Sequence, residues 1–336
     1  MNNLKKVGLT ALAGSLAAVS ANAAEMTVSG ASVLTYTSED TTEVTGNPFG
    51  MKTNIGFTAS GEVNGYTVSY MQTVKDQFAG MSSARLTIDM GDMGTLAFDQ
   101  GSGSGLGTID DKTPTAAEEI WDGIDTDGTS GAKGLVGTAG ASGVFNYIQS
   151  FAGVTLNAAA RKGSGTKTAD GGSSGAGQSA WDFALTGTGD TMGVDGLAWG
   201  VGYGEKDNGE QPNTAGDADG EDVHMTVFAN YSMGPVTVGA QMSELNAGAV
   251  GSTDQIVDAW GIALNINENM SVSYGEREVE FAKPGAAHVT EDGEGIAVAY
   301  TMGSMKIAGN RNEVSNNDGT ASSNDQNTEI ALSFAF

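Results

Sequence analysis

Apolar and polar residues alternate along most of this chain in short runs with a period of two. Within residues 327–336, for example, Ile330 and Leu332 alternate with Glu329 and Ala331. A period of two is typical of a β-strand with one apolar face, whereas a helical pattern repeats every 3.6 residues. The chain is therefore predicted to be all-β, built from strands that each turn one face toward an apolar environment.

The same pattern, followed from one end of the chain to the other, predicts sixteen strands. Their expected bounds are 26–37, 51–61, 65–74, 82–90, 95–100, 143–151, 154–162, 179–186, 197–205, 222–232, 236–245, 255–266, 270–280, 293–301, 304–314 and 327–336. Each run is of ordinary strand length, and none after the first 23 residues is long and apolar enough for a membrane-spanning helix.

The connections between the predicted strands alternate between short turns and longer polar loops. The turns are 64–65, 91–94, 152–153, 233–235, 267–269 and 302–303, with 187–196 as a longer member of the set. The loops are 38–50, 101–142, 163–178, 206–221, 246–254, 281–292 and 315–326, with 75–81 as a short member. This alternation favours strands that run up and down across a membrane in an antiparallel β-barrel, and it requires an even number of strands.

The beginning of the chain has the pattern of a secretory signal peptide. Lys5 and Lys6 precede an uncharged apolar stretch, residues 7–19, which is followed by the small residues Ala21-Asn22-Ala23. A short buried helix and a membrane anchor are alternatives, but the stretch is shorter than the roughly 20 residues that span a bilayer. We therefore expect residues 1–23 to be a signal peptide for export and residues 24–336 to form one barrel domain.

Aromatic residues gather near the ends of the predicted strands. Tyr66 follows a short turn, Tyr231 and Tyr300 precede two others, and Phe336 ends the chain. Aromatic girdles at both membrane interfaces are typical of outer-membrane barrels. The loop-side girdle would comprise Tyr36, Tyr70, Trp181, Tyr203 and Tyr274. The alternative is a soluble β-sandwich with aromatic residues scattered through its core.

Composition excludes several other classes of protein. Only 39% of the residues are hydrophobic, 51 are glycine and none is cysteine, which argues against a helical membrane protein, a disulfide scaffold and a cysteine-ligated metal. The formal net charge of −26 disfavours nucleic acid as a partner. The two histidines, His224 and His288, lie in no catalytic motif, so we predict neither an enzyme nor a required cofactor.

The strand alternation, the turns and loops, and the terminal Phe336 together resemble the general diffusion porins of Gram-negative bacteria, particularly the alphaproteobacterial type with sixteen strands. In that family the loop after the fifth strand is long and folds into the barrel, and here the longest connection, 101–142, follows the fifth predicted strand. The resemblance implies an outer-membrane channel for passive diffusion of small hydrophilic solutes and ions. It also implies a homotrimer, contact with outer-membrane lipid and lipopolysaccharide, and assembly by the machinery that recognises a terminal Phe.

The long loop is the candidate for a constriction, and a short helix is expected at 113–121 because Thr113 can cap a helix that begins at Pro114. The acidic candidates are Asp110, Asp111, Glu118, Glu119, Asp122, Asp125 and Asp127. The alternation turns five basic side chains toward the lumen, namely Lys52, Arg85, Arg161, Arg277 and Lys306. The acid excess predicts a preference for cations. The acids could instead lie on a solvated surface loop, and dominance of the basic residues would give anion preference.

Two smaller features carry separate predictions. Asp122, Asp125 and Asp127 lie close enough in sequence to supply oxygen ligands for calcium, although the segment does not fit the EF-hand register. Arg311 falls on the outward side of its strand, where it would contact the loop side of the barrel or lipopolysaccharide. In residues 144–148 the alternation does not decide which face of the predicted strand points outward. This strand could belong to a subunit interface.

Two further functions stay open at this point. A substrate-specific channel for sugars or amino acids would need aromatic side chains inside the barrel, but the alternation turns most aromatics outward, with Phe228 as an exception. A structural or adhesive barrel would need a plugged pore, and no folded plug domain or repeat array is visible in the sequence. A water-filled pore is the prediction that fits most of the pattern.

Overall fold

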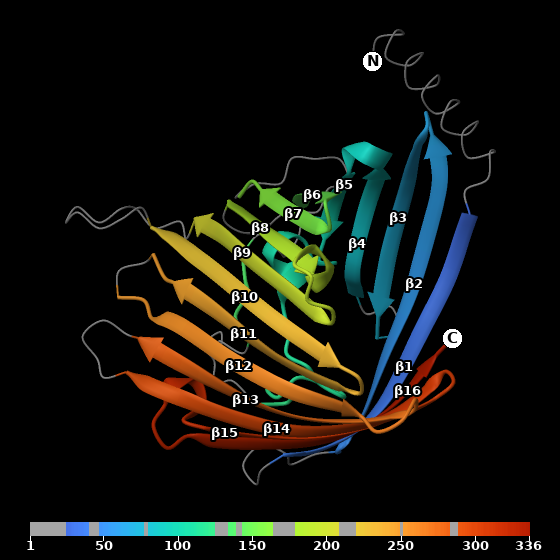
Figure 1. Ribbon diagram of the computed structural model, residues 1–336. Coiled ribbons are helices and arrows are strands. Elements are labelled where there is room, and N and C mark those ends of the chain that lie inside the picture. Colours follow the sequence, from blue (N-terminus) through green and yellow to red (C-terminus); the bar gives the residue numbers. More distant parts are fainter. Residues whose placement is uncertain are drawn as a thin grey trace, which may run out of the picture.

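The chain forms a closed β-barrel of sixteen antiparallel strands in the computed structural model (Figure 1). The structure describes residues 25–39, 47–76, 80–124, 134–138, 143–163, 179–207, 220–248, 251–282 and 288–336. Each strand pairs with its neighbours in sequence, and β16 closes the barrel against β1. The first eight strands are β1 (Glu25–Glu39), β2 (Phe49–Val63), β3 (Tyr66–Lys75), β4 (Gly80–Asp89), β5 (Thr95–Gln100), β6 (Val144–Phe151), β7 (Val154–Arg161) and β8 (Ala180–Thr188). The others are β9 (Leu197–Asp207), β10 (Glu221–Met233), β11 (Val236–Asn246), β12 (Asp254–Asn265), β13 (Met270–Ala282), β14 (Val289–Met302), β15 (Met305–Ser315) and β16 (Asn324–Ala335).

The sixteen predicted strands are all present, and β5 has the bounds that the sequence predicted. The largest difference is at β14, which begins at Val289 rather than at residue 293. The added residues include Thr290 and Asp292, which are polar on the outward side and so hide the alternation. Their backbone pairs with β13, because Glu280 lies opposite Thr290 and Glu278 opposite Asp292.

Each strand turns large apolar side chains outward and small or polar ones inward. On β16, Ile330 is 51% exposed on the outer surface, whereas Asn327 on the inner side is 1% exposed. The alternation also resolves β6, where Phe145 and Tyr147 face outward opposite Phe98 and Leu96, while Asn146 is buried inside. An apolar outer surface around a polar interior is the arrangement of a barrel that crosses a membrane.

The connections alternate as predicted between tight turns and longer loops. Asn64-Gly65 and Ala152-Gly153 both have positive φ, the backbone conformation that tight hairpin turns require. Four short 3-10 helices complete the described structure. They are η1 (Gly91–Met93), η2 (Gly105–Ile109), η3 (Gly189–Thr191) and η4 (Asn317–Gly319). No helix among the described residues is long and apolar enough to cross a membrane. The predicted signal peptide, residues 1–23, lies outside the described residues.

Candidate pore constriction

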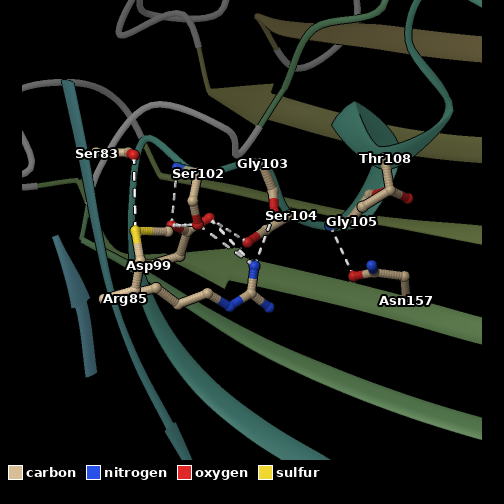
Figure 2. A network of polar contacts seen from close by, with 10 residues as sticks. Ser83, Arg85, Asp99, Ser102, Gly103, Ser104, Gly105, Thr108 and Asn157 are labelled. Atoms are coloured by element: carbon tan, nitrogen blue, oxygen red, sulfur yellow. Dashed lines mark hydrogen bonds and ion pairs between the residues drawn. The ribbon is translucent and has the colours of Figure 1, made fainter. Parts of the chain in front are cut away.

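The long connection after β5, described over residues 101–124 and 134–138, folds into the barrel and follows its inner wall (Figure 1). It begins in a polar network around Asp99 at the end of β5 (Figure 2). Asp99 accepts hydrogen bonds from the backbone nitrogen of Ser102 at 2.9 Å and from the hydroxyl of Ser104 at 2.5 Å. Arg85, opposite Asp99 on β4, donates to the carbonyl oxygen of Gly103 at 3.0 Å. These contacts turn the chain inward as soon as the strand ends.

A small apolar core then holds η2 against the wall. Leu106 and Ile109 of the loop are fully buried and pack with Val136, Ala184 and Phe228. Phe228 therefore faces inward, as the alternation predicted, but it is covered by the loop and is not displayed to solutes. The loop backbone is also bound to the wall here, because Asp182 of β8 accepts a hydrogen bond from the nitrogen of Leu106 at 3.0 Å.

The middle of the loop continues along the inner wall from β10 to β15. The backbone nitrogen of Lys112 donates a hydrogen bond to Gln241 on β11 at 2.7 Å. The backbone carbonyl oxygen of Lys112 accepts one from Asn230 on β10, also at 2.7 Å. The nitrogen of Ala116 donates to Ser273 on β13 at 2.9 Å. The carbonyl oxygen of Asp122 accepts from Asn312 on β15 at 2.8 Å.

The short helix predicted for residues 113–121 is wrong. Residues 113–119 are irregular and residues 120–123 form a turn, whereas the helical turn of the loop is η2, earlier in the chain. The nitrogen of Ala117 donates to the hydroxyl of Thr115, whereas in a helix it would have bonded to the carbonyl oxygen of Thr113. Ser273 and Asn312 of the barrel wall bind the backbone of the same segment. The capping signal at Thr113-Pro114 could not reveal this competition.

The described acidic candidates lie together in the loop. They are Asp110, Asp111, Glu118, Glu119 and Asp122; Asp125 and Asp127 lie outside the described residues. Burial raises the pKa of the Asp111 carboxyl to about 6, and the adjacent charge of Asp110 adds to the rise. Burial likewise raises the pKa of Asp110 and of Glu119, the latter also through the charges of its acidic neighbours. The carboxylates thus form one mutually repelling cluster.

Glu329 on β16 extends this cluster from the wall. Its carboxylate interacts electrostatically with Asp122 and Glu118 of the loop and with Lys52 of β2. Glu329 is not among the acidic residues predicted for the site, although its place on the inward side of the last strand is visible in the alternation. Lys52 is exposed on the inner side of β2, opposite Val33.

The five basic candidates all point inward, but they do not form one patch. Arg277 is almost fully buried in an ion pair with Glu291 on β14, and its guanidinium lies 5.6 Å from the ring of Trp121 in the loop. Arg85 is held by Asp99 and the loop backbone. These two arginines therefore attach the loop to the wall. Of the other three predicted bases, Lys52 is exposed, and Arg161 and Lys306 are half-buried.

The structure describes only part of the predicted calcium site, and it describes both histidines. Among the residues that the structure describes, no group of three or more His, Cys, Asp or Glu side chains is placed to hold a metal ion. Calcium binding by Asp122, Asp125 and Asp127 stays a prediction, because two of these residues are not described. His224 is buried on β10 beside Gly137 of the loop, and His288 contacts Glu280 on the loop side.

A closed barrel with an apolar outer surface and a loop along its inner wall defines an outer-membrane channel. The chain belongs to the Gram-negative porin family, whose family model matches residues 8–336. Family and fold are those of a channel rather than of an enzyme.

Solved outer-membrane proteins share this fold at low sequence identity. OmpT of Vibrio cholerae is similar with a TM-score of 0.69 and 13% identity, over 93% of this chain and 98% of that one. Its trimer form gives a TM-score of 0.66 and 12% identity, over 94% of this chain and 100% of that one. A triple mutant of Rhodopseudomonas blastica porin gives a TM-score of 0.60 and 14% identity, over 93% and 100% of the two chains. No curated protein matches the chain at a significant level.

Proposed function

We propose that this protein forms a water-filled channel for passive diffusion of small hydrophilic solutes and ions, with a preference for cations. The observation that carries the proposal is the charge at the loop. Glu118, Glu119 and Asp122 lie with Glu329 around one part of the lumen. Two of the predicted opposing charges, Arg85 and Arg277, are bound to acids of the wall. Carboxylates in a narrow pore raise the local concentration of cations and repel anions.

A substrate-specific sugar or amino-acid channel has less support. Such a channel would display inward aromatic rings to its solute. Among the described residues, Phe228 and Trp121 point into the barrel and are buried against the loop or wall. Phe281, on the inward side of β13, is partly buried against Val257 and Val279. The interior near the loop is instead rich in carboxylates, which suits small charged solutes.

Planar lipid bilayers test both parts of this proposal. Purified protein should give stepwise, ohmic currents, with a reversal potential under a KCl gradient on the cation side. The triple variant Glu118→Gln, Glu119→Gln, Asp122→Asn should move that potential toward zero, while the control Asp258→Asn, Glu278→Gln on the outer surface should leave it unchanged. Absence of current from folded wild-type protein would refute the diffusion channel; an unchanged potential in the triple variant would refute the role of the loop acids.

We also infer that the channel works as a homotrimer. The outward sides of β16 and β1–β8 carry no acidic or basic residue among the described positions. The outward sides of β9–β15 are strongly acidic. They carry Glu205, Asp207, Glu221, Glu244, Asp254, Asp258, Glu276, Glu278, Glu280, Asp292, Glu294, Arg311 and Glu313. Identical copies would repel one another across the acidic side, so the uncharged side is the one that can face a second copy.

Strand length points to the same side. β5 has six residues, β6 and β7 have eight each, and β8 has nine. About 9–11 residues are needed for a tilted strand to cross the hydrocarbon layer. Irregular backbone at membrane depth is tolerated only where protein or water covers it. A neighbouring copy would cover the low wall at β5–β7, and OmpT of Vibrio cholerae, a structural neighbour, has a trimer form.

The remaining partners follow from the outer surface and the chain ends. The acidic side, with Trp260 and Tyr274 bound to Glu276, would face the polar layer of outer-membrane lipid and lipopolysaccharide. Arg311, which binds Glu313 and Gln326 on this surface, would contact the same layer. Export by residues 1–23 and recognition of Phe336 by the barrel assembly machinery complete the proposal.

A further inference from the structure

A continuous row of glycine and asparagine residues crosses the inner wall at one level. Four inward glycines lie directly opposite one another on β11–β14, because Gly239 faces Gly261, Gly261 faces Gly275 and Gly275 faces Gly295. The row continues through asparagines at both ends. Its full order is Asn230, Gly239, Gly261, Gly275, Gly295, Asn312 and Asn327, one residue from each of β10–β16.

The loop lies directly on the four glycines. A Cβ atom at Gly261 would come within 2.6 Å of the carbonyl oxygen of Pro114, and one at Gly239 within 2.9 Å of the Cδ atom of Pro114. A Cβ atom at Gly275 would lie 3.2 Å from the Cγ2 atom of Ile120, and one at Gly295 would lie 3.0 Å from its Cβ. Real Cβ atoms do not approach a backbone oxygen as closely as 2.6 Å, so alanine at Gly261 requires the loop to move.

The asparagines at the ends of the row bind the backbone of the same loop segment. Asn230 donates to the carbonyl oxygen of Lys112 at 2.7 Å. Asn312 donates to the carbonyl oxygens of Glu119 and Asp122, at 3.1 and 2.8 Å. Asn327 donates to the carbonyl oxygen of Asp122 at 3.4 Å. The amides thus attach both ends of residues 112–122, while the glycines let the segment between them lie flat.

We propose that this row is the seat that positions the constriction loop, and that it sets how far the carboxylates of residues 110–122 project into the pore. The inference rests on the proposed channel function and deepens it. Glycine in a strand interior weakens the strand, so four paired glycines are a feature that needs a reason. Close approach of another chain segment is such a reason. The backbone oxygen of Pro114 provides it at Gly261, and the side chain of Ile120 provides it at Gly275 and Gly295.

The chain offers a matched control one step away from the row. Gly293 is on β14, two residues before Gly295 and on the same inward side, yet a Cβ atom there would meet nothing closer than 3.7 Å. Gly293→Ala therefore adds the same methyl group to the same strand without touching the loop. Gly261→Ala is the test variant, because the atom it meets belongs to the backbone and cannot rotate away.

The experiment compares single-channel conductance and reversal potential of the wild type, Gly261→Ala and Gly293→Ala, with the heat-dependent gel shift of folded barrels as a check on folding. In Gly261→Ala the displaced loop should narrow the pore and lower conductance by roughly a quarter or more, since the narrowest section sets permeability. Gly293→Ala should behave as the wild type. Equal conductance in all three folded proteins would overturn the proposed role of the row in positioning the loop but leave the channel function intact.

A disulfide tests the seat without relying on current. The chain has no cysteine, and the hydroxyls of Thr115 in the loop and Ser273 in the wall lie 3.5 Å apart. The double variant Thr115→Cys, Ser273→Cys should oxidise almost completely in the folded barrel. Little oxidation would show that the loop does not stay on the wall and would overturn the proposal. If wild-type protein conducts no current but the disulfide forms, the proposed channel function is refuted, while the placement of the loop on the row is supported.

Discussion

At the scale of single residues, burial decides which charges of the interior reach the lumen. All five predicted bases point inward, yet Arg277 has a side chain that is only 3% exposed, because Glu291 and Trp121 cover it. The direction of each side chain was readable from the alternation. Its partner was not, because Arg85 meets Asp99 and Arg277 meets Glu291 only through the pairing register of neighbouring strands. Sequence therefore predicted the face of a residue better than its role.

The loop carboxylates make ion preference depend on pH. Burial and the charge of Asp110 raise the pKa of Asp111 to about 6, so this group is mainly ionised at pH 7 and mainly protonated at pH 5. Its loss of charge should lower cation preference, and the reversal potential under a KCl gradient should move toward zero as pH falls from about 7 to 5.

Two variants separate Asp111 from other acids in that titration. Asp111→Asn should show a smaller cation preference at pH 7 and a smaller change down to pH 5. Asp258→Asn, on the exposed outer side of β12, should keep the pH response of the wild type. A full response in Asp111→Asn would show that a different group titrates in this range.

At the scale of elements, the strands were predictable and the loop conformation was not. Period-two alternation is a local signal, and it placed all sixteen strands; the largest shift of a strand end is the four residues at the start of β14, where the outward side becomes polar. The loop instead takes its shape from partners far away in sequence, such as Asn312 and Ser273. The glycine row was also hidden, because four glycines on four strands form a row only once the register is known.

The buried pair of Arg277 and Glu291 should contribute strongly to the stability of the barrel with its loop in place. Arg277→Ala leaves Glu291, which is 3% exposed, without its counter-charge and removes the contact with Trp121. We expect the free energy of unfolding to fall by about 3–5 kcal/mol, as measured by urea titration in lipid vesicles.

An exposed pair and a double variant provide the controls for this measurement. Arg311 and Glu313 form an ion pair on the outer surface, with side chains 56% and 48% exposed. Arg311→Ala should change the free energy of unfolding by less than about 1 kcal/mol. Arg277→Met combined with Glu291→Leu should recover most of the stability, because no buried charge is left unpaired. Equal losses in Arg277→Ala and Arg311→Ala would contradict the anchoring role of the buried pair.

At the scale of the whole molecule, the two sides of the barrel differ in both charge and height. The low wall at β5–β7 is uncharged on its outer side, whereas the taller strands β9–β15 carry a band of outward acids. This asymmetry was present in the sequence, but it appears only when every outward residue is assigned to its strand. In the proposed trimer, the acidic side would face lipid and the uncharged side would face the other copies.

Outward alanines on the two sides allow a direct test of the trimer interface. Ala158 on β7 lies between Tyr147 and Phe183 on the low wall, and Ala240 on β11 lies between Ala229 and Trp260 on the acidic side. A fluid lipid layer can accommodate an added tryptophan, whereas a packed protein interface cannot. Ala158→Trp should therefore convert most of the trimer to monomer on semi-native gels and in native mass spectrometry, with the barrel still folded. Ala240→Trp should remain trimeric, and the opposite pattern would place the interface on the acidic side of the barrel.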